Sequence, residues 1–186
     1  MSTVPLKPVT ADFVLADVDT SSHPGVDKKS AEKELLSNHD TLADLQERLF
    51  AESKFGGTRS VLLVLQAMDT AGKGGITRHV LGMVDPQGVA MRSFGVPTPE
   101  ERRHHYLWRI KRGLPRPGLI GVFDRSHYED VLVVRVEELV EEEVWRKRYA
   151  EINKWEKSLV DDDTIVIKLA LMVSHDEQGI RLMERL

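Results

Sequence analysis

The 186-residue chain is long enough for one domain with its own core, and with 41% hydrophobic and 30% charged residues its composition is typical of a globular protein. It has no cysteine, which excludes disulfide bonds and thiolate metal sites and favours a reducing compartment. Its net charge of −4 disfavours nucleic acid as a partner.

Residues 1–29 are rich in Pro, Asp, Ser and Thr, and we expect a loosely structured lead-in to a domain that spans residues 30–186. The N-terminus lacks the basic flank and apolar core of a signal peptide. No apolar run approaches the roughly 18 residues that a membrane span needs. We therefore expect a cytoplasmic protein.

Helices and strands are predicted to alternate through the rest of the chain. Helical spacing of apolar residues predicts helices over residues 30–52, 73–83, 98–112 and 141–159, and a last helix that begins after Ser174. Two of these starts, at Thr98 and Ser174, carry the Ser/Thr-x-x-Glu pattern of a capping box. Short apolar runs predict strands over residues 61–65, 89–94, 119–123 and 164–171. This alternation is typical of an α/β fold with a mostly parallel sheet.

A glycine-bearing turn, Gln66–Gly75, lies between the strand predicted at 61–65 and the next helix. A turn in this position presents successive backbone N–H groups and a helix N-terminus, which together bind phosphate oxygens. Gly72 permits close approach of the backbone, and Lys73 can reach the phosphates as a compact cation. The turn therefore predicts a phosphate-binding loop. A tight β–α turn with a surface lysine is the alternative.

The loop departs from the pattern G-x-x-x-x-G-K-[S/T], because Ala67 replaces the first glycine and Gly74 replaces the hydroxyl residue that binds Mg²⁺. Metal binding would then depend on carboxylates, and Asp69 lies within the loop. Asp124 ends the third predicted strand, where ligands gather in open α/β sheets, and is the second candidate. Arg125 follows it and could bind phosphates through two N–H groups, with a structural ion pair as the alternative.

A basic stretch lies between Met91 and Gly118, where seven cations face only two carboxylates. It suggests a local polyanion site, with a solvated helix face as the alternative. After Arg125, four further polar residues are candidates for the wall of an acceptor pocket, with packing or solvated surface as the alternative for each. They are His127, Tyr128, Glu129 and Asp130.

Five blocks of the sequence together resemble the polyphosphate kinase 2 family. They cover residues 67–75, 85–88, 93–97, 106–110 and 123–136. The resemblance extends from Leu15 to the end of the chain. It implies a three-layer α/β/α P-loop kinase fold of the thymidylate-kinase type, in which inorganic polyphosphate exchanges a terminal phosphate with a nucleotide. It also implies Mg²⁺, or Mn²⁺ in its place, as cofactor and a homodimer or homotetramer.

The resemblance implies roles for residues at matching positions. Asp69 and Asp124 would hold the metal and orient the acceptor phosphate, while Lys73 and Arg125 would bind the phosphates being transferred. The run Ser126–Asp130 resembles the branch that accepts both AMP and ADP, with Glu129 helping to set that preference. The other implied phosphate or polyphosphate contacts are Ala71, Gly72, Gly74, Gly75, Arg78, Arg181 and Arg185, and the implied nucleotide contacts are Arg109, His127, Tyr128 and Glu129.

Two departures from the family are expected to matter. His105 stands where many relatives have aspartate. Relatives also continue past Leu186, so we expect a lid that begins near residue 174 and is cut off at 186. Two other functions stay open, an ATP-dependent nucleotide kinase and a catalytically impaired polyphosphate-binding protein. The preferred base and the net direction of transfer are not predicted.

Overall fold

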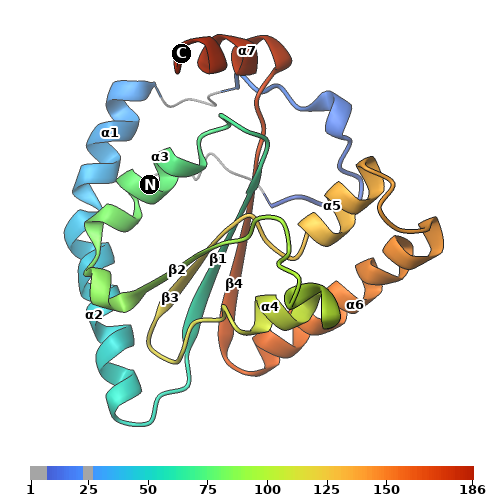
Figure 1. Ribbon diagram of the computed structural model, residues 1–186. Helices are drawn as coiled ribbons and strands as arrows, with labels where there is room; N and C mark the ends of the chain where they lie inside the picture. The colour runs from blue at the N-terminus through green and yellow to red at the C-terminus, as the bar shows by residue number, and fades with distance from the viewer. Residues whose placement is uncertain (1–7, 23–26) are drawn as a thin grey trace.

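The computed structural model describes residues 8–22 and 27–186 as a parallel sheet with helices on both faces (Figure 1). The strands are β1 (Ser60–Ala67), β2 (Val89–Ser93), β3 (Ile120–Asp124) and β4 (Thr164–Leu171). Their order in the sheet is β2-β3-β1-β4, and every pair is parallel. This confirms the predicted α/β class, and the bounds predicted for the last strand are those observed.

The helices found in the described residues form two layers and a cap. They are α1 (Lys28–Ser37), α2 (His39–Lys54), α3 (Lys73–His79), α4 (Leu107–Lys111), α5 (Glu129–Val136), α6 (Glu142–Asp161) and α7 (His175–Met183). The first three lie on one side of the sheet and α4 to α6 on the other, while α7 crosses above the carboxyl ends of the strands (Figure 1). Nowhere in the described residues is a helix both long and apolar enough to cross a membrane.

The core lies on both faces of β1, because successive residues of a strand point to opposite sides of a sheet. Leu62 and Val64 belong to one buried cluster, which Trp155 of α6 completes on its side of the sheet. Leu63 and Leu65 belong to a second cluster, against which Ile76 and other partly buried residues pack. The continuous apolar run in β1 is therefore explained by burial on both faces.

The helix predicted over 30–52 is wrong as a single element. It begins earlier, at Lys28, because Asp27 caps it by accepting a hydrogen bond from the Ser30 amide at 3.0 Å. It is also interrupted at Asn38. Of the predicted lead-in, residues 1–7 and 23–26 lie outside the described residues, and the rest contains a 3-10 turn, Leu15–Asp17, and the start of α1 at Lys28.

Helix α2 is attached by a polar residue to the 3-10 turn Pro86–Gly88, which precedes β2. Gln46 is only 3% exposed and accepts a hydrogen bond from the Asp85 amide at 3.3 Å, whereas Leu45 is 55% exposed. Gly88 leaves the space that Gln46 fills, since a Cβ there would lie 1.4 Å from the Gln46 Nε2 atom. The pattern of leucines did not indicate this contact.

The helix predicted over 98–112 is also wrong as a single element. Its capping box is present, because Thr98 and Glu101 each accept a hydrogen bond from the backbone amide of the other. The chain then leaves the helical conformation at His104, with φ −110° and ψ 166°, and α4 starts at Leu107. The His104 ring stacks on Trp108, four residues further along the chain, at a centroid distance of 4.1 Å.

Candidate active site

The turn between β1 and α3 has the backbone that a phosphate loop requires. Thr70 and Gly72 have positive φ angles of 65° and 107°. A Cβ on Gly72 would meet nothing within 4 Å, so glycine is needed there for its conformation and not for space. The Gly75 amide donates to the Gly72 carbonyl at 2.9 Å. The Lys73 ammonium donates to the Ala67 carbonyl at 3.1 Å and so lies against the start of the loop.

A cavity of about 420 Å³ opens above this turn, and we call it the loop cavity. Its lining combines backbone amides of the turn with cations and two carboxylates, as a phosphate site with a divalent ion would need. The lining residues are Asp69, Thr70, Ala71, Gly72, Lys73, Gly74, Gly75, Arg78, His79, Asp124 and Arg185. The structure therefore brings together most of the phosphate-binding residues predicted from the sequence.

Asp124 reaches the loop cavity because β3 pairs with β1. Leu65 and Asp124 are register partners, and the Arg125 amide donates to the Leu65 carbonyl at 3.0 Å. The Oδ1 atom of Asp124 is buried and has no hydrogen-bond partner among residues 8–22 and 27–186. Because buried polar atoms are almost always partnered, this oxygen is a site where a cation would fit. The Arg125 guanidinium lies 3.4 Å from the Asp69 carboxylate and so links the strand end to the loop.

A hard divalent cation fits these two acids. Asp69 and Asp124 line one cavity and supply oxygen ligands. The described part of the chain contains no group of three or more His, Asp or Glu that could hold a metal alone. A cation held by Asp69 and Asp124 would therefore take its remaining ligands from phosphate and water, as is usual for Mg²⁺.

Helix α7 contacts the loop from above. Gln178 donates from Nε2 to the Asp69 carbonyl at 2.9 Å, and Arg181 donates from Nη1 to the Thr70 carbonyl at 3.0 Å. Arg181, which the sequence assigned to polyphosphate, is thus engaged with the backbone of the loop. Arg185 lines the loop cavity itself.

A second cavity, of about 610 Å³, is lined by Arg125, by the segment that follows β2 and by residues of α4, α5 and α6. We call it the arginine cavity, since four arginines and three carboxylates line it. The charged lining residues are Arg102, Arg109, Arg125, Arg148, Glu101, Glu129 and Asp130, and the uncharged ones include Gly95, Val96, Pro97, His104, Tyr106 and Val133. This balance suits an anionic ligand with an uncharged part.

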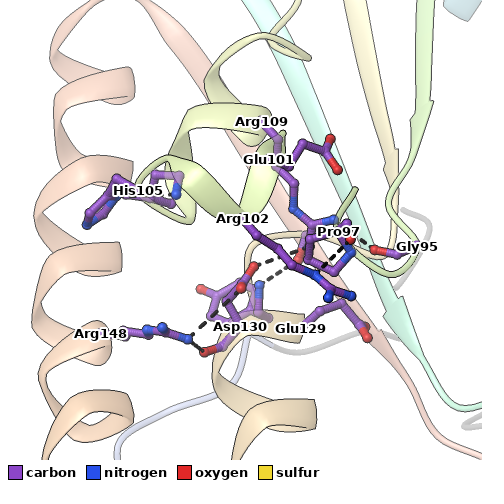
Figure 2. Close-up of polar contacts among 12 residues, drawn as sticks. Gly95, Pro97, Glu101, Arg102, His105, Arg109, Glu129, Asp130 and Arg148 are labelled. Carbon is purple, nitrogen blue, oxygen red and sulfur yellow. Dashed lines mark hydrogen bonds and ion pairs between the residues drawn. The ribbon is translucent and has the colours of Figure 1, made fainter. Parts of the chain in front are cut away.

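Hydrogen bonds to the backbone and to Asp130 hold the arginines of this cavity in place (Figure 2). Arg109, 8% exposed, donates to the Gly95 carbonyl at 2.7 Å and lies 3.4 Å from the Asp130 carboxylate. Arg148 of α6 donates to the Asp130 carbonyl at 2.6 Å. Burial raises the pKa of Asp130, and Arg109 and Arg148 oppose that rise. Arg102 donates only its Nε, to the Pro97 carbonyl at 3.1 Å, so its other two nitrogens are the ones available at the cavity.

The predicted nucleotide contacts separate into two groups. Arg109 and Glu129 line the arginine cavity. His127 is fully buried and lies 3.0 Å from Glu156, and the Tyr128 hydroxyl donates to the same carboxylate at 2.8 Å. His127 and Tyr128 line neither cavity. Nucleotide binding by these two stays a prediction that their placement does not support.

His105 also faces away from the arginine cavity. Its side chain is 59% exposed, lies 3.6 Å from Glu151 and sits on the side of α6 in Figure 2. Sequence reasoning missed Gln178 and Arg148, which contact the site from α7 and α6. Arg148 had no signal, because it is one of several cations on a charged helix. Gln178, near the capping box of α7, could only have been found once the helix was placed over the loop.

The fold and the site together define a P-loop kinase fold: a parallel sheet of order β2-β3-β1-β4, a phosphate loop after β1 and an acid at the end of the adjacent strand. The crystal structure of polyphosphate kinase 2 from Arthrobacter aurescens TC1 superposes with a TM-score of 0.92 and 49% identity, over 95% of this chain and 63% of that one. Polyphosphate kinase 2 is also the family that matches residues 25–186, and the chain belongs to it.

Curated relatives agree with that family. The AMP/ADP-polyphosphate phosphotransferase of Meiothermus ruber is 49% identical over 168 residues, which are 90% of this chain and 61% of the relative. The ADP-polyphosphate phosphotransferase of Rhodopseudomonas palustris is 40% identical over 180 residues, with the same two coverages. The chain thus spans less than two thirds of the length of these relatives.

Proposed function

We propose that this chain carries the transfer site of a polyphosphate:AMP/ADP phosphotransferase, which moves a terminal phosphoryl group between inorganic polyphosphate and a nucleotide. The names of the relatives from Meiothermus ruber and Rhodopseudomonas palustris support this reaction. The observation on which it depends is the unpartnered, buried oxygen of Asp124 in the same cavity as Lys73 and the loop amides. A buried anion among phosphate-binding groups is explained when a metal–phosphate complex occupies the cavity.

Phosphoryl transfer needs positioning and charge neutralisation more than covalent chemistry from the protein. Mg²⁺, with Mn²⁺ as a possible replacement, would neutralise phosphate charge when held by Asp69 and Asp124. The Lys73 side chain and the amides of Gly72, Lys73 and Gly74 would bind the phosphates of the donor. Arg125 would align donor and acceptor oxygens, so that the acceptor oxygen bonds to the terminal phosphorus as the bridging P–O bond breaks.

The two cavities suit the two substrates. We assign polyphosphate to the loop cavity, where Arg78 and Arg185 add charge beyond Lys73. We assign the nucleotide to the arginine cavity, where Arg102 has free N–H groups and uncharged residues can contact the nucleoside. Arg125 lines the arginine cavity and contacts Asp69 of the loop cavity, so transfer would occur between them.

Turnover with two donors tests the proposal. Purified protein with Mg²⁺, polyphosphate and AMP or ADP should form ADP or ATP, measured by chromatography, and polyphosphate should be preferred over ATP as donor. Preference for ATP would identify a nucleotide kinase. Salt-sensitive polyphosphate binding without turnover, unchanged in Asp124→Asn, would identify a binding protein. The expected homodimer or homotetramer is tested by light scattering on the same sample.

A further inference from the structure

A largely buried polar cluster lies against the β3–α5 loop, and its members line neither cavity. At its centre is Glu156 of α6, only 8% exposed. Its carboxylate interacts with His127 Nε2 at 3.0 Å, the Tyr128 hydroxyl at 2.8 Å and the Lys168 ammonium at 2.6 Å. The site described above uses none of these four residues directly, and Glu156 lines neither cavity.

The cluster is a charged hydrogen-bond network. Burial alone would raise the pKa of Glu156, but hydrogen bonds from His127, Lys168 and Tyr128 outweigh it and lower that pKa to about 2. Because the carboxylate accepts, His127 donates from Nε2, and its buried Nδ1 has no partner. A network of this kind fixes its members in one arrangement, because the buried Glu156 carboxylate and His127 ring have no solvent to replace a lost hydrogen bond.

The same short loop carries the groups that face the cavities. Arg125 has a positive φ of 64°, a conformation that non-glycine residues keep only when their surroundings hold it. On the cavity side, Ser126 donates to the Gln66 side chain at 3.2 Å, and Gln66 donates to Glu129. On the opposite side, His127 and Tyr128 are bound to Glu156. The loop is therefore held from two sides.

Backbone hydrogen bonds connect His127 and Tyr128 to the first turn of α5. The Asp130 amide donates to the His127 carbonyl at 3.2 Å, and the Leu132 amide donates to the Tyr128 carbonyl at 2.8 Å. A shift of His127 and Tyr128 would therefore move the first turn of α5, which starts at Glu129.

We propose that Glu156 is a positioning residue, which acts through His127 and Tyr128 to fix Arg125 and Glu129 beside the cavities. The effect of Glu156 on catalysis rests on the proposed function, whereas its effect on the position of the loop does not. Displacing transfer groups by about 1 Å can cost about 100-fold in rate, so a carboxylate remote from the substrates can still govern turnover.

The test compares Glu156→Gln with a stability-matched control on the same helix. Glutamine keeps the shape of Glu156 but loses its charge, and its NH₂ group replaces an oxygen that accepts either from Lys168 or from His127 and Tyr128. The control is Ile152→Val, or Ile152→Ala where a larger stability loss is needed, because Ile152 is 1% exposed and lies outside the network. Amide hydrogen exchange reports the loop at residues 130–132, and steady-state kinetics report KM and kcat.

In Glu156→Gln we expect exchange at residues 130–132 to rise by about tenfold and kcat to fall by about 10- to 100-fold, with the KM for polyphosphate near that of wild type. The Ile152 variant whose melting temperature equals that of Glu156→Gln should change neither the exchange at residues 130–132 nor kcat. Equal effects in both variants would overturn the proposal, because general loss of stability would then explain them. If Glu156→Gln does not fold, Tyr128→Phe removes one donor of the same network and is judged by the same comparison.

The two proposals can fail separately. If the wild-type protein shows no turnover with polyphosphate, the proposed function fails. The exchange comparison still decides whether Glu156 holds the loop, since it needs no substrate.

Discussion

The substitution Asp124→Asn should remove most phosphoryl transfer and, in the same protein, stabilise the ligand-free fold. Asparagine keeps the shape of the side chain but not its charge. One unit charge about 4 Å from a cation contributes about 4 kcal/mol near a protein surface, which corresponds to about a thousandfold in kcat. This loss is expected because, among the described residues, only Asp69 and Asp124 bring carboxylates to the loop cavity.

The stabilisation has a separate cause. The unpartnered Oδ1 atom of Asp124 is buried, and a buried polar atom without a partner costs about 1–3 kcal/mol, more when it is charged. Replacing the charged group by a neutral one should recover about 1 kcal/mol of this, or about 2–4 °C in melting temperature for a chain of this size. Mg²⁺ should raise the melting temperature of wild type and leave that of Asp124→Asn unchanged.

Calorimetry with and without Mg²⁺ measures the melting temperatures. Chromatography of the ATP formed measures the loss of phosphoryl transfer. The matched control is Asp44→Asn on α2, where the carboxylate is exposed and pairs with Arg48 within one helix. This control should change neither quantity. The reasoning is refuted if Asp124→Asn melts below wild type while retaining activity, because Asp124 would then be a structural partner and not a metal ligand.

Three further outcomes are expected. Arg181→Ala removes the hydrogen bond to the Thr70 carbonyl, and because a bond to a charged group contributes about 1.5–3 kcal/mol, polyphosphate should bind about tenfold more weakly or worse, as titration calorimetry would show. Gly88→Ala should destabilise by about 1–3 kcal/mol in urea unfolding, since its Cβ would overlap Gln46, and Gln46→Ala should recover part of that loss. The pKa of Glu156 is lowered from 4.5 to about 2, so its stabilising effect is complete above pH 4.5 and is lost as pH falls toward 2. The stability difference between wild type and Glu156→Gln should therefore shrink over that range, and a constant difference would contradict it.

Local chemistry made part of this structure predictable. The unbroken apolar run of β1 indicates burial on both faces, and Gly72 needs a conformation that few other residues adopt. The alternation of strands and helices places Asp124 at the same edge of the sheet as the phosphate loop. Each of these inferences depends on neighbours in sequence or on a general rule of parallel sheets.

Tertiary contacts decide the parts that were missed. Residues 131–136, rich in valine, form most of α5 although β-branched residues favour strands, because the segment packs against α6. Arg148 enters the site from another helix, and nothing near it in the sequence indicates that contact.

The position of Arg125 limits how the proposed substrate preference can be changed. One guanidinium lies 3.4 Å from Asp69 at the phosphate loop and also lines the arginine cavity. Under the proposed assignment of the substrates to the two cavities, a substitution at Arg125 would change the binding of both. Variants that prefer a different nucleotide should be obtained more readily by substituting Arg102, which lines one cavity, than by substituting Arg125.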